Sequence, residues 1–202
     1  MNKVITISRE FGSGGHEIGE KLASRLNIPF YDNTLSEVAA SNIGIDISKI
    51  AGIDETAANS FIYSLYVGSG YAANLNANLA SSTSQDRLFA EQTRLIEEYA
   101  DNGPCVIVGR CSDYILRNRS DCLHVFICSS FKNRTERIMK KMSVNESNGA
   151  VLVKKTDKSR SSYYQYYTSK KWGLPTSYDL CINTDTIDID DAVDILVKIL
   201  TD

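Results

Sequence analysis

The sequence predicts an α/β fold in which helices flank a doubly wound parallel β-sheet. Three segments, "CVIVGR" at 105–110, "CLHVFICS" at 122–129 and "YDLCIN" at 178–183, are largely apolar rather than alternating. Such runs are typical of strands that are buried on both faces. Segments with helical periodicity separate them, and strands that alternate with helices indicate this fold class.

The N-terminal part contains two further strand–helix units. Residues 4–7 form an apolar strand, and a glycine cluster leads from it into a segment with apolar residues every fourth position from residue 17 onward, which predicts a helix. Residues 28–31 read as a second short strand, and residues 34–44 as a second helix. Residues 46–84 are rich in Ala, Asn, Ser and Gly, so we expect an irregular subregion there.

The remaining helices are predicted at about 88–99, 111–118, 131–142 and 192–200, each from its apolar spacing. With 202 residues, of which 43% are hydrophobic and 23% charged, the chain suits one compact domain spanning residues 1–202. The sequence shows no signal-peptide pattern and no apolar run of about 20 residues, so a soluble cytoplasmic protein is expected.

Charge is distributed unevenly along the chain. The net charge is −3, but residues 131–171 carry eleven Lys and Arg against three Asp and Glu, a local charge of +8. The rest of the chain therefore carries −11, and a basic segment on an acidic body indicates a surface for an anion. The five cysteines show no C-x-x-C pair; those in or beside strand-like runs, Cys105, Cys122, Cys128 and Cys181, are expected to be small buried hydrophobic residues.

The glycine cluster in "ISREFGSGGHEIG" is the first candidate site, because open α/β sheets bind ligands at the carboxyl ends of their strands. The dinucleotide motif G-x-G-x-x-G fails, since its third glycine position holds Glu17. The phosphate-binding P-loop G-x-x-x-x-G-K-[ST] matches in part: Gly15 stands at the lysine position, and His16 at that of the hydroxyl. A plain glycine-rich turn is the alternative. If the loop binds phosphate, we expect its N–H groups to do so, at Gly12, Ser13, Gly14, Gly15 and His16.

Basic residues follow the other predicted strand ends. Arg110 ends the strand at 105–110, and Arg134 and Arg137 lie in the first turns of the helix predicted at 131–142. Because arginine grips phosphate oxygens in pairs, several arginines at the ends of one sheet favour an anion site. Further along, "KTDKSR" adds Lys155, Lys158 and Arg160. Arg9 occupies the first P-loop position, and we predict that it replaces the missing lysine.

Six segments resemble, in the same order, the blocks of bacterial cytidylate kinases, and more closely those of the cytidylate kinase-like group. They are "ITISREFGSGGHEIGEKLA", "FYDNTLSEVA", "VIVGRCSDYIL", "SSFKNRTERI", "DKSR" and "YDLCINTDTIDIDDAVDIL". The resemblance implies a P-loop NTPase-type sheet, a nucleoside-monophosphate-binding region that would include residues 46–84, and an arginine-rich helical lid at about 131–171. It implies that Arg110 faces the monophosphate and that Asp32 lies near the acceptor. The lid elements would be the R-x-x-R of Arg134 and Arg137 and the D-x-x-R of Asp157 and Arg160.

The chain departs from that pattern at three positions. Gly15 and Glu17 replace the lysine and threonine of the cytidylate kinase loop, and Cys111 replaces the aspartate that follows the G-R element. The resemblance therefore transfers the fold more firmly than the substrate base.

Together these features predict a kinase that uses ATP and Mg²⁺ to phosphorylate a small acceptor, in first place a nucleoside monophosphate. No metal-ligating residue is assigned. A catalytically silent nucleotide-binding protein is the alternative, since the loop lysine mainly stabilises a transition state. The basic, tyrosine-rich stretch "SSYYQYYTSKKW" could also form an RNA surface, but we favour packed tyrosines and expect neither nucleic-acid nor membrane binding. The candidate catalytic residues are Arg9, Asp32, Arg110, Arg137 and Arg160, and the candidate nucleotide-binding residues are Gly12, Ser13, Gly14, Gly15, His16, Arg134, Asp157 and Lys158.

Overall fold

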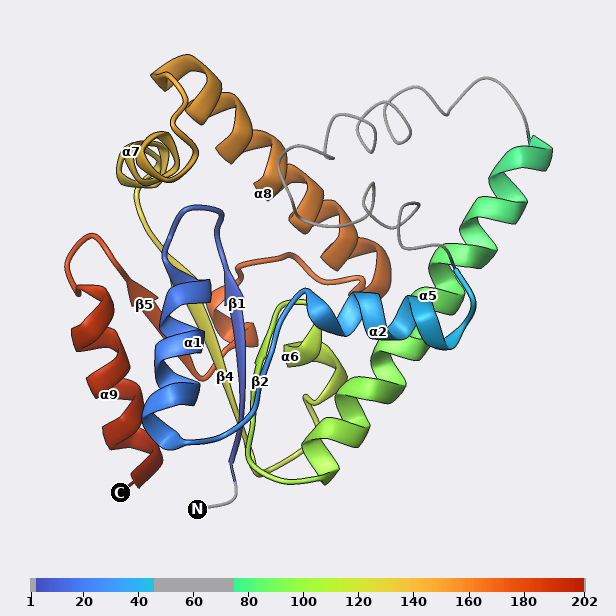
Figure 1. The fold of residues 1–202 in the computed structure, drawn as a ribbon, viewed down its shortest axis with the longest axis horizontal. Helices are drawn as coiled ribbons and strands as arrows, with labels where there is room; N and C mark the ends of the chain where they lie inside the picture. The colour runs from blue at the N-terminus through green and yellow to red at the C-terminus, as the bar shows by residue number, and fades with distance from the viewer. Residues whose placement is uncertain (1–2, 46–74, 202) are drawn as a thin grey trace.

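A five-stranded parallel sheet forms the centre of the computed structural model, which describes residues 3–45 and 75–201 (Figure 1). The strands lie in the order β2-β3-β1-β4-β5. Their bounds are β1 Val4–Arg9, β2 Phe30–Tyr31, β3 Val106–Val108, β4 Cys122–Cys128 and β5 Leu180–Asn183. The strand order, with β1 in the middle and the chain crossing between non-adjacent positions, confirms the predicted doubly wound sheet.

The register of the sheet brings three strand ends together. Ile7 of β1 pairs with Val108, the last residue of β3, and Arg9 pairs with Ile127 near the end of β4. Parallel strands present their carboxyl ends at one edge, so the segments that follow β1, β3 and β4 share this edge.

Helices cover both faces of the sheet (Figure 1). On one face, α1 Gly15–Leu26 and α9 Ile189–Thr201 enclose an aliphatic core that includes Ile5, Ile7 and Leu196. On the other face, α2 Thr34–Asn42, α5 Leu75–Asp101 and α6 Ser112–Ile115 contribute to the second core. Alternate residues of β1 therefore belong to different cores.

Two helices cross the carboxyl edge of the sheet. They are α7 Phe131–Met142 and α8 Glu146–Thr168, and α8 runs from the end near α7 across the sheet towards α2 and α5 (Figure 1). Each begins with a side-chain cap: the Ser130 hydroxyl accepts the N–H of Asn133, and the Asn145 side-chain oxygen accepts the N–H of Asn148. The predicted basic segment is thus a helical hairpin above the strand ends. A short 3₁₀ turn, Pro175–Ser177, then leads into β5.

Three expectations from the sequence need correction. Residues 75–84 are not irregular but form the first turns of α5, because their alanines and leucines extend a helix that the following residues already nucleate. Helix α6 is shorter than 111–118. Cys181 is exposed rather than buried, since β5 is an edge strand. Residues 46–74 of the expected subregion lie outside the described residues. Within the described part of the chain, none of the helices combines the length and apolarity that crossing a bilayer requires.

Candidate functional site

The glycine loop, residues 10–14, joins β1 to α1 at the carboxyl edge of the sheet. Gly14 precedes the helix with φ +88°, a left-handed conformation that glycine adopts without strain. This turn directs the first N–H groups of α1, at Gly15 and His16, out of the helix, and neither donates to another described residue. Such a helix start is suited to an anion.

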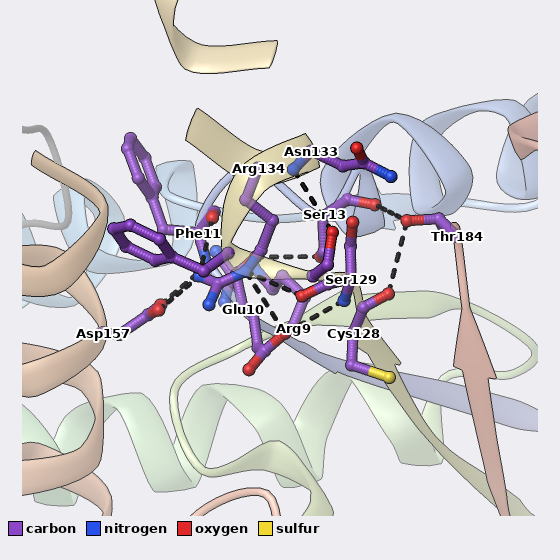
Figure 2. A network of polar contacts seen from close by, with 12 residues as sticks. Arg9, Glu10, Phe11, Ser13, Cys128, Ser129, Asn133, Arg134, Asp157 and Thr184 are labelled. Carbon is purple, nitrogen blue, oxygen red and sulfur yellow. Dashed lines mark hydrogen bonds and ion pairs between the residues drawn. The ribbon is translucent and has the colours of Figure 1, made fainter. Parts of the chain in front are cut away.

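Hydrogen bonds hold the loop in place, both within the loop and to the residues that directly follow β4 and β5 (Figure 2). The hydroxyl of Ser13 is fully buried and donates to the carbonyl of Glu10 at 2.8 Å. The Thr184 hydroxyl donates to the Ser13 carbonyl at 2.8 Å, and the Glu10 carboxylate accepts the Ser129 N–H at 3.0 Å. Ser13 therefore faces into the protein, and its N–H also donates to the Glu10 carbonyl, at 3.2 Å. A phosphate contact by Ser13 stays a prediction.

Arg134 and Asp157 join the glycine loop to α7 and α8 (Figure 2). The Arg134 guanidinium donates to the carbonyls of Ser129 at 3.0 Å and Phe11 at 3.1 Å, and it forms an ion pair with Asp157. The other Asp157 oxygen accepts the Phe11 N–H at 2.8 Å. Both residues were predicted to bind phosphate; in this arrangement they support the loop, and a phosphate contact by either stays a prediction.

Arg9 lies between the glycine loop and the end of β3. It is only 6% exposed. A Cβ atom on Gly15 would lie 2.5 Å from the Arg9 Cβ, and one on Gly109 would lie 2.2 Å from the Arg9 Nη1. At position 15 a side chain would collide with the Arg9 Cβ, so Arg9 fills the volume beside the loop that a residue-15 side chain would enter. At position 109 the φ of +82° favours glycine, and the Arg9 guanidinium lies beside this residue, just after β3.

A crevice of about 770 Å³ opens above the loop. Arg9, Arg137 and Arg160 line it together with Gly12, Gly14, Gly15 and His16. Arg137 reaches the loop itself, because a Cβ on Gly14 would lie 3.0 Å from its Nη1. Lys158, also predicted here, is on the exposed side of α8 and lines neither this crevice nor the cavity described next.

A second, smaller cavity lies under α8, at the end of β3. Arg9, Arg110 and Arg160 line it, with Tyr163 and Trp172 among its aromatic walls. Arg110 is 7% exposed, and it lines the cavity from a turn in which Gly109, Arg110 and Cys111 all have positive φ, at 82°, 56° and 56°. Left-handed backbone at two consecutive non-glycine residues is unfavourable, and such strain concentrates at functional sites.

Arg160 connects the two spaces. Its Nη1 donates to the Arg9 carbonyl at 2.8 Å, and its guanidinium lies 5.5 Å from the centre of the Phe11 ring. Arg9 and Arg160 are thus shared by the crevice and the cavity. Of the predicted catalytic set, the structure brings Arg9, Arg137 and Arg160 together at the crevice and Arg9, Arg110 and Arg160 together at the cavity.

Asp32, the fifth predicted catalytic residue, is paired with His16. The His16 Nε2 lies 2.8 Å from one carboxylate oxygen, and the Thr34 N–H donates to the other at 3.2 Å. Burial alone would raise the pKa of Asp32, but these hydrogen bonds outweigh it and hold that pKa below the usual aspartate value. The sequence analysis named both residues but not their pairing, which joins positions from two separate strand–helix units.

The described side chains do not form a ready Mg²⁺ site. Among residues 3–45 and 75–201, no three His, Cys, Asp or Glu side chains gather where they could hold a metal ion. The hydroxyl of Ser13 is buried, and both oxygens of Asp32 accept protein hydrogen bonds. Mg²⁺ commonly binds through substrate phosphates and water, with few protein ligands. The residues around the glycine loop are compatible with Mg²⁺ binding of this kind.

The tyrosines of α8 are mostly packed inside. Tyr164 is 3% exposed, Tyr167 stacks on Phe89 with ring centres 3.9 Å apart, and the Tyr163 hydroxyl donates to Gln92 at 2.9 Å. Only Tyr166, at 67%, is largely exposed among them. This agrees with the expectation that the tyrosines of this stretch pack against the protein.

A glycine loop after the central strand of a five-stranded parallel sheet in the order 2-3-1-4-5, with helices over the strand ends, defines the P-loop kinase fold. Solved kinases share it. Shikimate kinase from Bacteroides thetaiotaomicron has a TM-score of 0.54 at 13% identity, over 99% of both chains. A gluconokinase from Sinorhizobium meliloti 1021 has a TM-score of 0.50 at 13% identity, over 98% of this chain and 93% of its own. At these identities the likeness is one of fold.

Within that fold, the chain belongs to the cytidylate kinase-like family, whose model matches residues 4–186. An uncharacterised protein from Eubacterium ventriosum ATCC 27560 is 30% identical, with a TM-score of 0.72 over 98% of both chains. A curated relative named uronate isomerase, from Corynebacterium glutamicum, is 26% identical over 149 residues, which is 72% of this chain. The chain spans 28% of that relative's length.

Proposed function

We propose that the protein is an ATP-dependent phosphotransferase that moves the γ-phosphoryl group to a small anionic acceptor, with a nucleoside monophosphate as the first acceptor to test. The observation that carries the proposal is the sharing of Arg9 and Arg160 by two adjoining spaces. Phosphoryl transfer requires a donor and an acceptor to meet in line, with positive charge at the meeting point.

In this arrangement the crevice receives ATP. The N–H groups at the start of α1 bind its phosphates, and Arg137 approaches from α7. Arg9 lies between donor and acceptor and supplies the charge that a P-loop lysine supplies elsewhere. Mg²⁺ would enter with the ATP phosphates.

The cavity under α8, of about 40 Å³, receives the anionic group of the acceptor. Its arginines, Arg110 foremost, bind the acceptor's anionic group. A phosphate acceptor is already an anion and needs no strong base, so Asp32 and His16 serve to position groups at the crevice rather than to remove a proton.

A coupled assay of ADP formation tests the proposal. ATP and Mg²⁺ are supplied with CMP, UMP, AMP, GMP or small hydroxyl acceptors, and one acceptor should raise ADP formation well above the rate without acceptor. Hydrolysis that no acceptor stimulates would contradict it.

A silent nucleotide-binding protein is the second candidate. The absence of a lysine at Gly15 and the inward-facing hydroxyl of Ser13 favour it. Calorimetry and the ADP assay together separate the two proposals, because a silent binder takes up ATP in calorimetry but forms no ADP with any acceptor.

A further inference from the structure

The cavity under α8 has a buried carboxylate behind it, Asp113 in α6. Asp113 is 3% exposed and does not itself line the cavity. Its two side-chain hydrogen bonds both come from hydroxyl groups: Ser8 donates to one oxygen at 3.1 Å, and Tyr164 donates to the other at 2.7 Å. Burial raises the pKa of Asp113, although these two hydrogen bonds act in the opposite direction.

Each of these three residues lies next to a different arginine of the cavity. Ser8 precedes Arg9 in β1, Tyr164 lies one helical turn after Arg160 in α8, and Asp113 follows the strained turn that carries Arg110. One carboxylate therefore joins the three backbone segments from which the cavity's arginines extend. Because the Asp113 carboxylate accepts hydrogen bonds from two hydroxyl groups, it holds these segments in place through uncharged partners.

We propose that Asp113 is a positioning residue: through Ser8 and Tyr164 it holds Arg9, Arg160 and Arg110 in the arrangement that binds an oxyanion of the acceptor. The proposal rests on the assignment of the cavity to the acceptor. It concerns anion binding, however, and so can be measured without turnover.

The test titrates inorganic phosphate into the full-length protein with saturating ATP in the crevice, using calorimetry. Loss of the heat in Arg110→Ala identifies binding at the cavity. Ser8→Ala, Tyr164→Phe and Asp113→Asn should each raise the phosphate dissociation constant about tenfold, or 1.4 kcal/mol, because the arginines lose their fixed geometry. ATP affinity should change less than phosphate affinity in all three, since main-chain N–H groups at the start of α1, which none of these substitutions removes, bind the ATP phosphates in the proposed arrangement.

Two matched controls separate positioning from general destabilisation. Thr6 lies on the same strand face as Ser8, is fully buried and has its hydroxyl 2.8 Å from His124 Nδ1, but it does not adjoin an arginine of the cavity. Thr6→Ala should lower the melting temperature as Ser8→Ala does and leave phosphate affinity unchanged. Tyr166→Phe, at an exposed position on α8, should change neither.

The pattern across the variants decides the outcome. Equal phosphate affinity in Ser8→Ala, Thr6→Ala and the wild type overturns the proposal, and so does a wild type that binds no phosphate. Tighter binding in Asp113→Asn with no change in Ser8→Ala also overturns it, because Asp113 would then act through charge alone. If phosphate binding follows the expected pattern but no acceptor is phosphorylated, the proposed phosphotransferase activity fails and the positioning role stands. If an acceptor is found, the three variants should raise its KM more than they lower kcat.

Discussion

The crevice above the glycine loop and the cavity under α8 share two arginines, yet they are built differently. The crevice is wide and of mixed charge, with Glu17, Glu20, Arg137 and Lys140 among its lining residues. The anion-binding groups proposed for it are main-chain N–H groups of a loop that a buried network supports. The cavity is small, and the groups proposed to bind there are side chains on a strained turn and two separate elements.

The difference teaches which changes each space tolerates. Main-chain N–H groups survive most substitutions as long as the loop keeps its shape, so the crevice should fail only when its supports are removed. The cavity should fail whenever one arginine is removed or displaced. Four substitutions test this division, beginning with the one expected to change the protein most.

Removing Arg134 should break the support of the glycine loop. Arg134→Ala leaves Asp157 without its ion-pair partner and the carbonyls of Phe11 and Ser129 without their donor. We expect the free energy of unfolding to fall by about 3 kcal/mol, measured by urea denaturation. Lys132→Ala, at an exposed position on the same helix, should change it by less than about 0.5 kcal/mol; a similar small change in Arg134→Ala would contradict the support role.

Removing Arg9 should separate catalysis from nucleotide binding. Its charge acts where donor and acceptor meet, so Arg9→Ala should lower turnover roughly 100-fold or more, about 2.7 kcal/mol, while ATP affinity falls less. Steady-state kinetics and calorimetry measure the two effects. Arg25→Ala, which removes an exposed arginine from α1, is the control. Full activity in Arg9→Ala would show that the lysine is not replaced by this residue.

Removing Arg110 should affect the cavity alone. Arg110→Ala should raise the acceptor KM at least about tenfold and leave the KM for ATP nearly unchanged. Equal changes in both constants would show that the crevice and the cavity are not separate sites.

The pair of His16 and Asp32 should make a small, pH-dependent contribution to stability. Because the folded-state pKa of Asp32 is lowered, its contribution is complete above the ordinary aspartate pKa of about 4 and is lost as the pH falls below it. Asp32→Asn should thus be less stable than the wild type near neutral pH by less than about 1 kcal/mol, and the difference should shrink in acid. Glu37→Gln, at an exposed site on α2, should show no such trend; a difference between Asp32→Asn and the wild type that does not shrink as the pH is lowered would contradict the pairing.

The sequence predicted the fold closely because the signals are local. Apolar runs marked the buried strands, and the helix expected at 131–142 has those bounds in the structure. The first turns of α5 were missed, because a stretch of Ala, Asn and Ser carries no periodic apolar pattern although it can continue a helix that has already formed.

The candidate site was predicted less completely, because side-chain direction depends on distant residues. That arginines gather at the strand ends followed from topology. The buried partners of Arg134 did not, since Asp157 lies 23 residues away and reaches it only when α8 packs on the loop. The direction of the Arg9 side chain depends on the glycines at positions 15 and 109, which leave room for it. The sequence does not reveal this role, because the three residues come together only in the folded chain.

The contact between Arg9 and Gly15 also has an evolutionary consequence. A Cβ at position 15 would lie 2.5 Å from that of Arg9, so an ancestor that gained a lysine at 15 while keeping Arg9 would have had two side chains in one volume. An ancestor that lost Arg9 first would have had no cation beside the loop. Either order passes through a disfavoured intermediate, which is the condition for sign epistasis. Homologues should therefore fall into two separate groups, with arginine at 9 and glycine at 15, or with lysine at 15 and a displaced or smaller residue at 9, and chains that carry both cations should be rare.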